Sequence, residues 1–147
     1  MFEFLSYRVA RVMSTPVVTL HPDQSLLDLQ RVLEDGGFNG CPVATEGDRL
    51  LGFATSFDLL KAFRFSTQTI APHYDEIMSA PVESVMTRDP RTVSPELPLS
   101  RVLETMAELR VTGLPVADSS GIVVGMITRR DIMRALRESS GRSEHQQ

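Results

Sequence analysis

The segment Gly52-Phe-Ala-Thr55-Ser-Phe-Asp58 returns later in the chain as Gly125-Met-Ile-Thr128-Arg-Arg-Asp131. The offset between the two is 73 residues, from position 52 to position 125, and it relates many further pairs without a gap. These pairs include Val12-Met13 with Val85-Met86, Thr19 with Thr92, Pro22 with Pro95, Leu26 with Leu99, Pro42-Val43-Ala44 with Pro115-Val116-Ala117, and Ala62 with Ala135. Self-similarity at one fixed offset over this length indicates an internal structural repeat.

Both copies show the same order of expected elements. An extended segment comes first, at 17–20 in copy one and 91–94 in copy two, and it ends before a proline that cannot continue a strand ladder. Apolar residues at helical spacing then predict a helix in each copy. They are Leu26, Leu29, Val32 and Leu33 in copy one, and Leu99, Val102, Leu103, Met106 and Leu109 in copy two. Gly36-Gly37 predicts the end of the first of these helices.

A hairpin and a second helix complete each copy. Short apolar runs on either side of turn residues predict the hairpin. The runs and turns are 41–45, Glu46-Gly47-Asp48 and 50–54 in copy one, and 114–118, Ser119-Ser120-Gly121 and 122–127 in copy two. A closing helix is expected at about 56–65 and 129–137. Each copy therefore has the order β-α-β-β-α, and the chain belongs to the α+β class.

The two copies are expected to fold as one module, because a unit of some fifty residues buries its sheet poorly alone and two can share a core. The sequence predicts motif one at 8–65 and motif two at 82–137, joined by an ordered connector at 66–81. The tail at 138–147 is polar and rich in serine, which predicts disorder.

The composition is that of an acidic globular domain. The 147 residues carry 15 Lys and Arg against 19 Asp and Glu, a net charge of −4, which disfavours a broad surface for nucleic-acid phosphates. Cys41 is the single cysteine, so no internal disulfide can form and a reducing compartment is favoured. No apolar run approaches the ~20 residues of a membrane span, and the N-terminal stretch lacks the pattern of a signal peptide. We therefore expect a cytoplasmic protein with no membrane partner.

Thr55-x-x-Asp58 and Thr128-x-x-Asp131 each stand where a predicted strand runs into a predicted helix. One interpretation is structural, because a threonine followed three residues later by an acid forms a capping box. The other interpretation is functional. A helix N-terminus offers free amide groups to a phosphate, and a carboxylate one turn further on can accept hydrogen bonds from ribose hydroxyls. The two interpretations are compatible, and both stay open on the residues alone.

Together these motifs resemble a tandem pair of cystathionine β-synthase (CBS) motifs over residues 8–137. The matching features are the doubled β-α-β-β-α order, Val-Met before the first extended segment, Gly-h-Pro-Val (h is apolar) in the hairpin, and Gly-h-h-Thr-x-x-Asp at the last junction. The resemblance implies two motifs packed about a pseudo-two-fold axis into one disc-like module. It also implies clefts that bind AMP, ADP, ATP or an S-adenosyl compound as a regulatory ligand, no required cofactor, and a homodimer that acts on a separate protein.

The resemblance assigns ligand-binding roles to residues of both copies. In the second copy Asp131 and Thr128 would hold the ribose and phosphate, and in the first copy Asp58 and Thr55 would do so. The remaining candidates would supply the backbone and apolar walls around the adenine. They are Thr92, Val93, Gly113, Leu114 and Pro115 for the second site, and Thr19, Leu20, Cys41 and Pro42 for the first.

The copies differ directly before the acidic residue. Arg129-Arg130 precedes Asp131, whereas Ser56-Phe57 precedes Asp58. Because a guanidinium can hold a phosphate through two donors, we expect the second site to bind a phosphorylated ligand through Arg129 and Arg130. The alternative is that these side chains lie on the solvated face of the helix. The first site is expected to be the weaker one.

Other reactive residue types predict no further site. Cys41 stands at a position that Leu114 fills in the second copy, which favours a buried apolar role over a nucleophile. His21, His73 and His145 lack the spacing of metal ligands, so no metal site is predicted. No nucleophile, base and orienting residue can be assembled, so we expect no enzymatic activity. A ligand-independent interaction module is the main alternative function, and a nucleic-acid binder is a weaker one.

Overall fold

The chain divides into two compact units, and their boundaries differ from those of the two sequence repeats. In the computed structural model, which describes residues 3–64 and 74–145, unit 1 combines Met1–Val17 with Arg91–Gln147, and unit 2 is Val18–Pro90. Unit 1 thus carries the helices and hairpin of the second copy, and unit 2 those of the first. Each unit mixes helices with antiparallel sheet, which confirms the α+β class.

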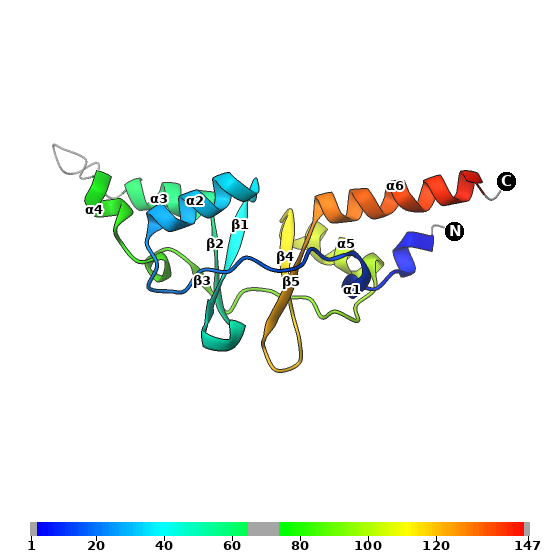
Figure 1. Ribbon diagram of the computed structural model, residues 1–147, viewed down its shortest axis with the longest axis horizontal. Helices are drawn as coiled ribbons and strands as arrows, with labels where there is room; N and C mark the ends of the chain where they lie inside the picture. Colours follow the sequence, from blue (N-terminus) through cyan, green and yellow to red (C-terminus); the bar gives the residue numbers. More distant parts are fainter. Residues whose placement is uncertain (1–2, 65–73, 146–147) are drawn as a thin grey trace. The chain divides into compact units, whose positions relative to one another are not determined.

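Both units place an antiparallel hairpin between two helices, as the sequence predicts (Figure 1). The described elements of unit 1 are η1 (Glu3–Ser6), α1 (Val9–Val12), α5 (Leu99–Leu109), β4 (Gly113–Ala117), β5 (Val123–Thr128) and α6 (Arg129–His145). Those of unit 2 are α2 (Leu26–Gly36), β1 (Gly40–Thr45), η2 (Glu46–Asp48), β2 (Arg49–Thr55), α3 (Ser56–Arg64), α4 (Tyr74–Met78), η4 (Val82–Ser84) and β3 (Thr87–Arg88). The hairpins share one register, since Gly40 pairs with Thr55 and Gly113 with Thr128.

Each unit has a hydrophobic core of its own. The buried apolar residues of unit 1 are Phe4, Val9, Val12, Val93, Leu99, Val102, Met106, Leu114, Val116, Ile127, Ile132 and Ala135. Those of unit 2 are Leu20, Leu26, Leu29, Leu33, Cys41, Val43, Ala54, Leu59, Met78, Val82 and Met86. In both cores the inward side chains of the hairpin pack against the apolar faces of the two flanking helices, which the helical spacing predicts.

The segment that precedes each copy in the sequence pairs with the hairpin of the other copy. Thr87-Arg88 forms β3, the third strand of the sheet in unit 2, and pairs with Phe53 and Gly52 of β2. In unit 1, Ser14 pairs in the same way with Met126 of β5. By contrast, the predicted extended segments 17–20 and 91–94 make only one parallel bridge each, Leu20 with Val43 and Val93 with Val116. The repeat pattern identifies these segments but not the sheet edge on which they lie.

Two repeated glycines allow this pairing. A Cβ atom on Gly125 would lie 2.8 Å from Met13 Sδ and 3.0 Å from the Ser14 carbonyl oxygen. On Gly52 it would lie 2.5 Å from Met86 Sδ and 2.8 Å from the carbonyl oxygen of Thr87. The backbone of the incoming segment therefore approaches the hairpin more closely than any side chain at these positions allows, which explains a glycine inside a strand.

The helix ends follow the local sequence. Ser25 and Asp28 form a reciprocal capping box at the start of α2, and Gly37 ends this helix with a left-handed φ of 64°. Helix α6 continues to His145, into the segment for which the sequence predicts disorder. The sequence from 138 to 145 contains no proline, so no residue there forces the helix to end. Of the predicted connector 66–81, residues 66–73 lie outside the described residues, and the rest forms α4 and a loop.

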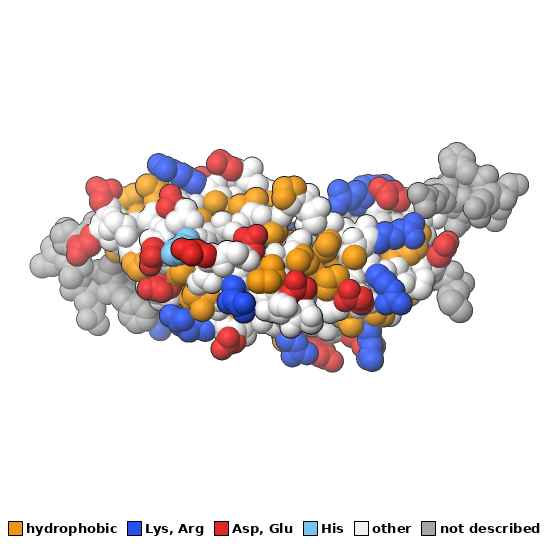
Figure 2. All heavy atoms as spheres, turned by 60° about the horizontal axis from the view of Figure 1, so that its bottom comes forward, with side chains coloured by type: hydrophobic (Ala, Val, Ile, Leu, Met, Phe, Trp, Pro, Cys, Tyr) orange, Lys and Arg blue, Asp and Glu red, His pale blue; other side chains and the backbone are white. Residues whose placement is uncertain are grey.

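One face of the molecule carries charges of both signs. On the face seen in Figure 2, acidic and basic side chains of the described residues lie between one another rather than in large patches of one sign. No helix within residues 3–64 and 74–145 is long and apolar enough to cross a membrane. In the same residues, no cluster of three or more His, Cys, Asp or Glu side chains could hold a metal ion.

Candidate ligand-binding site

Asp131 anchors the junction between β5 and α6. Its Oδ2 accepts hydrogen bonds from the Thr128 backbone amide at 2.8 Å and from Thr128 Oγ1 at 2.9 Å. In return the Asp131 amide donates to Thr128 Oγ1 at 3.4 Å. This reciprocal arrangement is a capping box, so the structural interpretation of Thr-x-x-Asp is confirmed.

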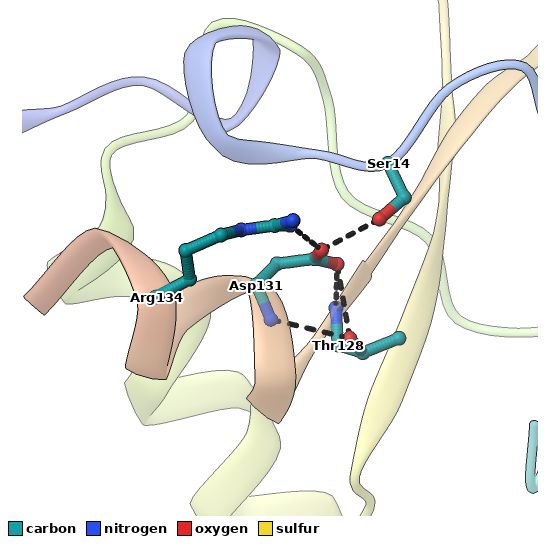
Figure 3. A network of polar contacts seen from close by, with 4 residues as sticks. All are labelled: Ser14, Thr128, Asp131 and Arg134. Atoms are coloured by element: carbon teal, nitrogen blue, oxygen red, sulfur yellow. Dashed lines mark hydrogen bonds and ion pairs between the residues drawn. The ribbon is translucent and has the colours of Figure 1, made fainter. Parts of the chain in front are cut away.

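The second carboxylate oxygen of Asp131 binds one side chain from the N-terminal segment and one from the next turn of α6. Oδ1 accepts a hydrogen bond from Ser14 Oγ at 2.6 Å, and Arg134 Nη2 lies 2.6 Å from the same oxygen (Figure 3). Asp131 itself is 2% exposed. A charge removed from water to this extent needs partners, and these four donors supply them.

Ser14 reaches Asp131 because the N-terminal segment pairs with β5. The Ser14 amide donates to the Met126 carbonyl oxygen at 2.8 Å, and the Met126 amide donates back at 3.2 Å. The adjoining turn, α1, is fixed further by the Val9 amide, which donates to the Leu97 carbonyl oxygen at 2.9 Å. Backbone hydrogen bonds of Ser14 therefore fix the position of its hydroxyl group. Arg134, by contrast, contacts Asp131 only through the end of a long side chain.

A pocket of about 340 Å³ opens beside this network, within unit 1. Its described lining comes from the N-terminal segment on one side and from α6 on the other. The lining residues are Tyr7, Arg11, Val12, Met13, Ser14, Thr15, Asp131, Arg134, Ala135, Glu138 and Ser139. The lower end of the usual volume range of small-molecule sites is about 300 Å³. The pocket thus combines a ligand-sized volume with a buried carboxylate.

The equivalent junction in unit 2 has the same capping box with different neighbours. Asp58 Oδ2 accepts from the Thr55 amide and from Thr55 Oγ1, both at 2.9 Å, and Asp58 is 6% exposed. Lys61 Nζ lies 3.1 Å from Asp58 Oδ1 and 5.4 Å from the centre of the Phe57 ring. Lys61 and Arg134 occupy equivalent positions in the repeat, so both carboxylates have a cation one helical turn further on.

The other predicted residues lie near these junctions but not in the pocket lining. Gly113 pairs with Thr128, and the Val93 amide donates to the Pro115 carbonyl oxygen at 3.1 Å. Val93 and Leu114 belong to the core of unit 1, and Thr92 is half-buried. In unit 2 the Leu20 amide donates to the Pro42 carbonyl oxygen at 3.0 Å; Leu20, Cys41 and Pro42 are buried, and Thr19 is half-buried. Of all predicted residues, Asp131 alone is among the described residues that line the pocket.

Arg129 and Arg130 are not among the described residues that line the pocket. Both side chains are exposed on the first turn of α6. The Arg129 backbone amide donates to the Thr112 carbonyl oxygen at 2.9 Å, which serves the helix start rather than a ligand. This placement matches the solvated alternative that the sequence left open.

The sequence interpretation missed the two side chains that complete the Asp131 network. Ser14 follows Val12-Met13, which the repeat had marked, but only the pairing with β5 brings it to Asp131. Arg134 carried a clearer signal, because the repeat places a cation three residues after the aspartate in both copies, at Lys61 and Arg134. Residues three apart on a helix are neighbours, so this pairing was within reach of the sequence.

Cys41 is a buried thiol. It is 1% exposed, and its Sγ lies 3.5 Å from the carbonyl oxygen of Val18. Burial raises the pKa of the Cys41 thiol from its ordinary 9.0 to about 12. The thiol therefore stays protonated at neutral pH, which confirms the apolar role predicted for it and opposes a nucleophilic one.

We expect Cys41 to resist thiol reagents in the folded protein. At pH 8 an aromatic disulfide reagent should react rapidly with urea-unfolded chain and far more slowly with native chain. Equal rates would contradict the burial.

The raised pKa of Cys41 also determines how the stability of the protein changes with pH. The contribution of the Cys41 thiol to the free energy of unfolding is complete below pH 9, where the thiol of the unfolded chain is protonated. This contribution is lost as the pH rises towards 12.

Comparison with known proteins places these features in a family context. The family model described as CBS domain matches residues 9–64 and 82–138. L-aspartate semialdehyde sulfurtransferase of Methanocaldococcus jannaschii is 30% identical over 126 residues, which are 86% of this chain and 22% of the relative. The chain thus spans about a fifth of that relative's length.

Two solved structures are similar over most of both chains. The CBS domain pair of protein MJ0100, in complex with 5′-methylthioadenosine and S-adenosyl-L-methionine, is 28% identical, with a TM-score of 0.72 over 87% of this chain and 94% of that one. CBSX2 in complex with AMP is 25% identical, with a TM-score of 0.76 over 90% of this chain and 97% of that one. The ligands in both structures contain adenosine.

Proposed function

Because this chain belongs to the CBS domain family, with two CBS repeats, we propose that it is a regulatory module that binds an adenosine-containing ligand in the pocket of unit 1. Asp131 accepts hydrogen bonds from the ribose hydroxyls, and Thr128 and the start of α6 keep the carboxylate in place. The module itself catalyses no reaction.

One observation carries this proposal: a carboxylate that is 2% exposed lines an open pocket of about 340 Å³. A capping box needs only one carboxylate oxygen, and Oδ2 of Asp131 fulfils that role. Oδ1 is bound to the side chains of two pocket residues, Ser14 and Arg134, which a ligand can replace. Hydrogen bonds to a charged group of low solvent exposure are stronger than those between neutral groups, so ribose hydroxyls gain affinity here.

The similar structures support this ligand class. One binds 5′-methylthioadenosine and S-adenosyl-L-methionine, and the other binds AMP. These molecules share a ribose with free 2′ and 3′ hydroxyls and differ in what the 5′ carbon carries. A carboxylate that binds the ribose accounts for the shared part. AMP, ADP, ATP and S-adenosyl compounds are therefore all candidate ligands of this chain.

Regulation would follow from a difference in affinity between two states of the module. A ligand shifts a conformational or dimerisation equilibrium only when it binds one state more tightly. Asp131 offers such a link, because its carboxylate joins α6 to Ser14 in the segment that pairs with β5. We propose that this change acts on a partner protein or an attached domain, and that the module functions in the cytoplasm as a homodimer.

Calorimetric titration with AMP, ADP, ATP and S-adenosylmethionine tests the proposal. We expect at least one of them to bind at unit 1 with one equivalent per chain, and to raise the melting temperature. At a concentration of 100 times Kd, a ligand that binds only the folded state adds about 2.7 kcal/mol of stability. If none of the four binds at millimolar concentration, the proposal is wrong.

A ligand-independent interaction module is the second candidate, and the capping boxes of both units favour it. In each box the carboxylate and the threonine hydroxyl bond each other's backbone amides, so these residues have a structural role of their own. Under this alternative, nucleotides leave the melting temperature unchanged, and Asp131→Ala costs about 1 kcal/mol through the lost cap. The melting experiment above therefore separates the two functions.

A further inference from the structure

The Asp131 carboxylate has no vacant acceptor position for a ribose. A carboxylate offers about four lone-pair sites. Two are bound by the amide and hydroxyl of Thr128, one by Ser14 Oγ and one by Arg134 Nη2. If the proposed function holds, a ribose hydroxyl must replace at least one of these donors.

The donors differ in how easily they can leave. The Thr128 groups belong to the start of α6, and Ser14 is held by two backbone hydrogen bonds to Met126. Arg134 is different, because its side chain is 52% exposed and only the guanidinium tip contacts Asp131. A long side chain of this kind can reorient without any change of the backbone. Displacement of Arg134 by the ribose therefore costs less free energy than displacement of Ser14 or Thr128.

A displaced guanidinium is stabilised by a new anionic partner. On release, its positive charge loses the Asp131 carboxylate, its partner in a short, charge-assisted ion pair. A nucleoside brings no negative charge, so its ribose breaks this pair without replacing it. A nucleotide carries its phosphate on the same ribose and offers the guanidinium two oxygens at once. Glu138, which also lines the pocket, is a single exposed carboxylate and a weaker substitute.

We propose that Arg134 is the specificity-determining residue of the unit 1 pocket: it releases Asp131 when the ribose binds and then holds the ligand's phosphate, so that nucleotides are preferred over uncharged nucleosides. This inference rests on the proposed function and names the residue that selects its ligand. It differs from the sequence expectation, which gave the phosphate to Arg129 and Arg130. Arg11, with its guanidinium carbon 3.8 Å from the Tyr7 ring centre, lines the same pocket and adds a second positive charge.

The test compares AMP with adenosine, which differ only in the phosphate, by titration of wild type, Arg134→Gln and Arg134→Lys. Wild type is expected to prefer AMP. In Arg134→Gln, AMP binding should weaken roughly tenfold, as for a lost hydrogen bond to a charged group. Adenosine binding should stay equal or strengthen, because no ion pair has to be broken. Compared with Arg134→Gln, Arg134→Lys should restore part of the preference for AMP. Lysine keeps the positive charge but lacks the planar guanidinium that offers two parallel donors to a phosphate.

A loss of AMP affinity that adenosine does not share distinguishes this role from a merely structural one, which would weaken both affinities. Arg130→Gln is the matched control on the same helix and should leave the ratio of the two affinities unchanged. Melting curves verify that the variants are folded. Equal affinities of wild type for AMP and adenosine, or an unchanged ratio in Arg134→Gln, would overturn this inference and leave the proposed function intact. Binding of neither ligand by wild type overturns this inference, and the proposed function falls with it only if ADP, ATP and S-adenosylmethionine also fail to bind.

Discussion

Replacing Asp131 with alanine is expected to weaken AMP binding by roughly 100-fold. The ribose hydroxyls lose a carboxylate, and each hydrogen bond to a charged group contributes about 1.5–3 kcal/mol. About 1.4 kcal/mol corresponds to a factor of ten, so one such bond of about 2.7 kcal/mol accounts for a loss of this size. The affinity is measured by calorimetry at a temperature well below the melting transition of the variant.

Asp58→Ala is the matched control, because Asp58 forms the same capping box in unit 2. Both variants should lose about 1 kcal/mol of stability through the weakened helix start. Only Asp131→Ala should lose the affinity for AMP in unit 1. The opposite order, with Asp58→Ala the more damaging, would place the principal site in unit 2.

Replacing Gly125 with valine is expected to destabilise unit 1 and to weaken ligand binding together. Even a Cβ atom there would lie 3.0 Å from the Ser14 carbonyl oxygen, and valine adds two methyl groups. Insertion of extra atoms into a packed region costs about 1–3 kcal/mol. Displacement of Ser14 also removes one wall of the pocket. Urea unfolding measures the first effect, and AMP titration of the folded variant measures the second.

Gly52→Val separates these two effects. It forces the same clash in unit 2, where a Cβ atom would lie 2.8 Å from the Thr87 carbonyl oxygen. We expect a similar loss of stability and an AMP affinity in unit 1 close to that of wild type. A Gly125→Val protein with unchanged stability and unchanged affinity would show that the N-terminal segment does not complete unit 1 as described.

The sequence predicted the parts of the fold that local patterns determine. Apolar spacing identified the helices at Leu26 and Leu99, and turn residues identified both hairpins. The junction of Thr128 and Asp131 was visible because a capping box is contained within four residues. All of these depend on contacts between residues that are close in the chain.

The remaining features depend on contacts across long stretches of chain. Ser14 and Asp131 are 117 positions apart, and no periodicity shows that the segment before copy one pairs with the hairpin of copy two. The choice between Arg129, Arg130 and Arg134 required the direction in which each side chain leaves α6. The difference from Ser56-Phe57 in the first copy favoured the first two, whereas Arg134 lines the pocket.

A crystal structure of the protein with bound AMP tests the central claim most directly. The account predicts that the ribose hydroxyls lie within hydrogen-bond distance of Asp131 Oδ1, with the guanidinium of Arg134 moved from that oxygen to the phosphate. An AMP molecule bound away from Asp131, with the contacts of Ser14 and Arg134 to the carboxylate intact, would contradict it.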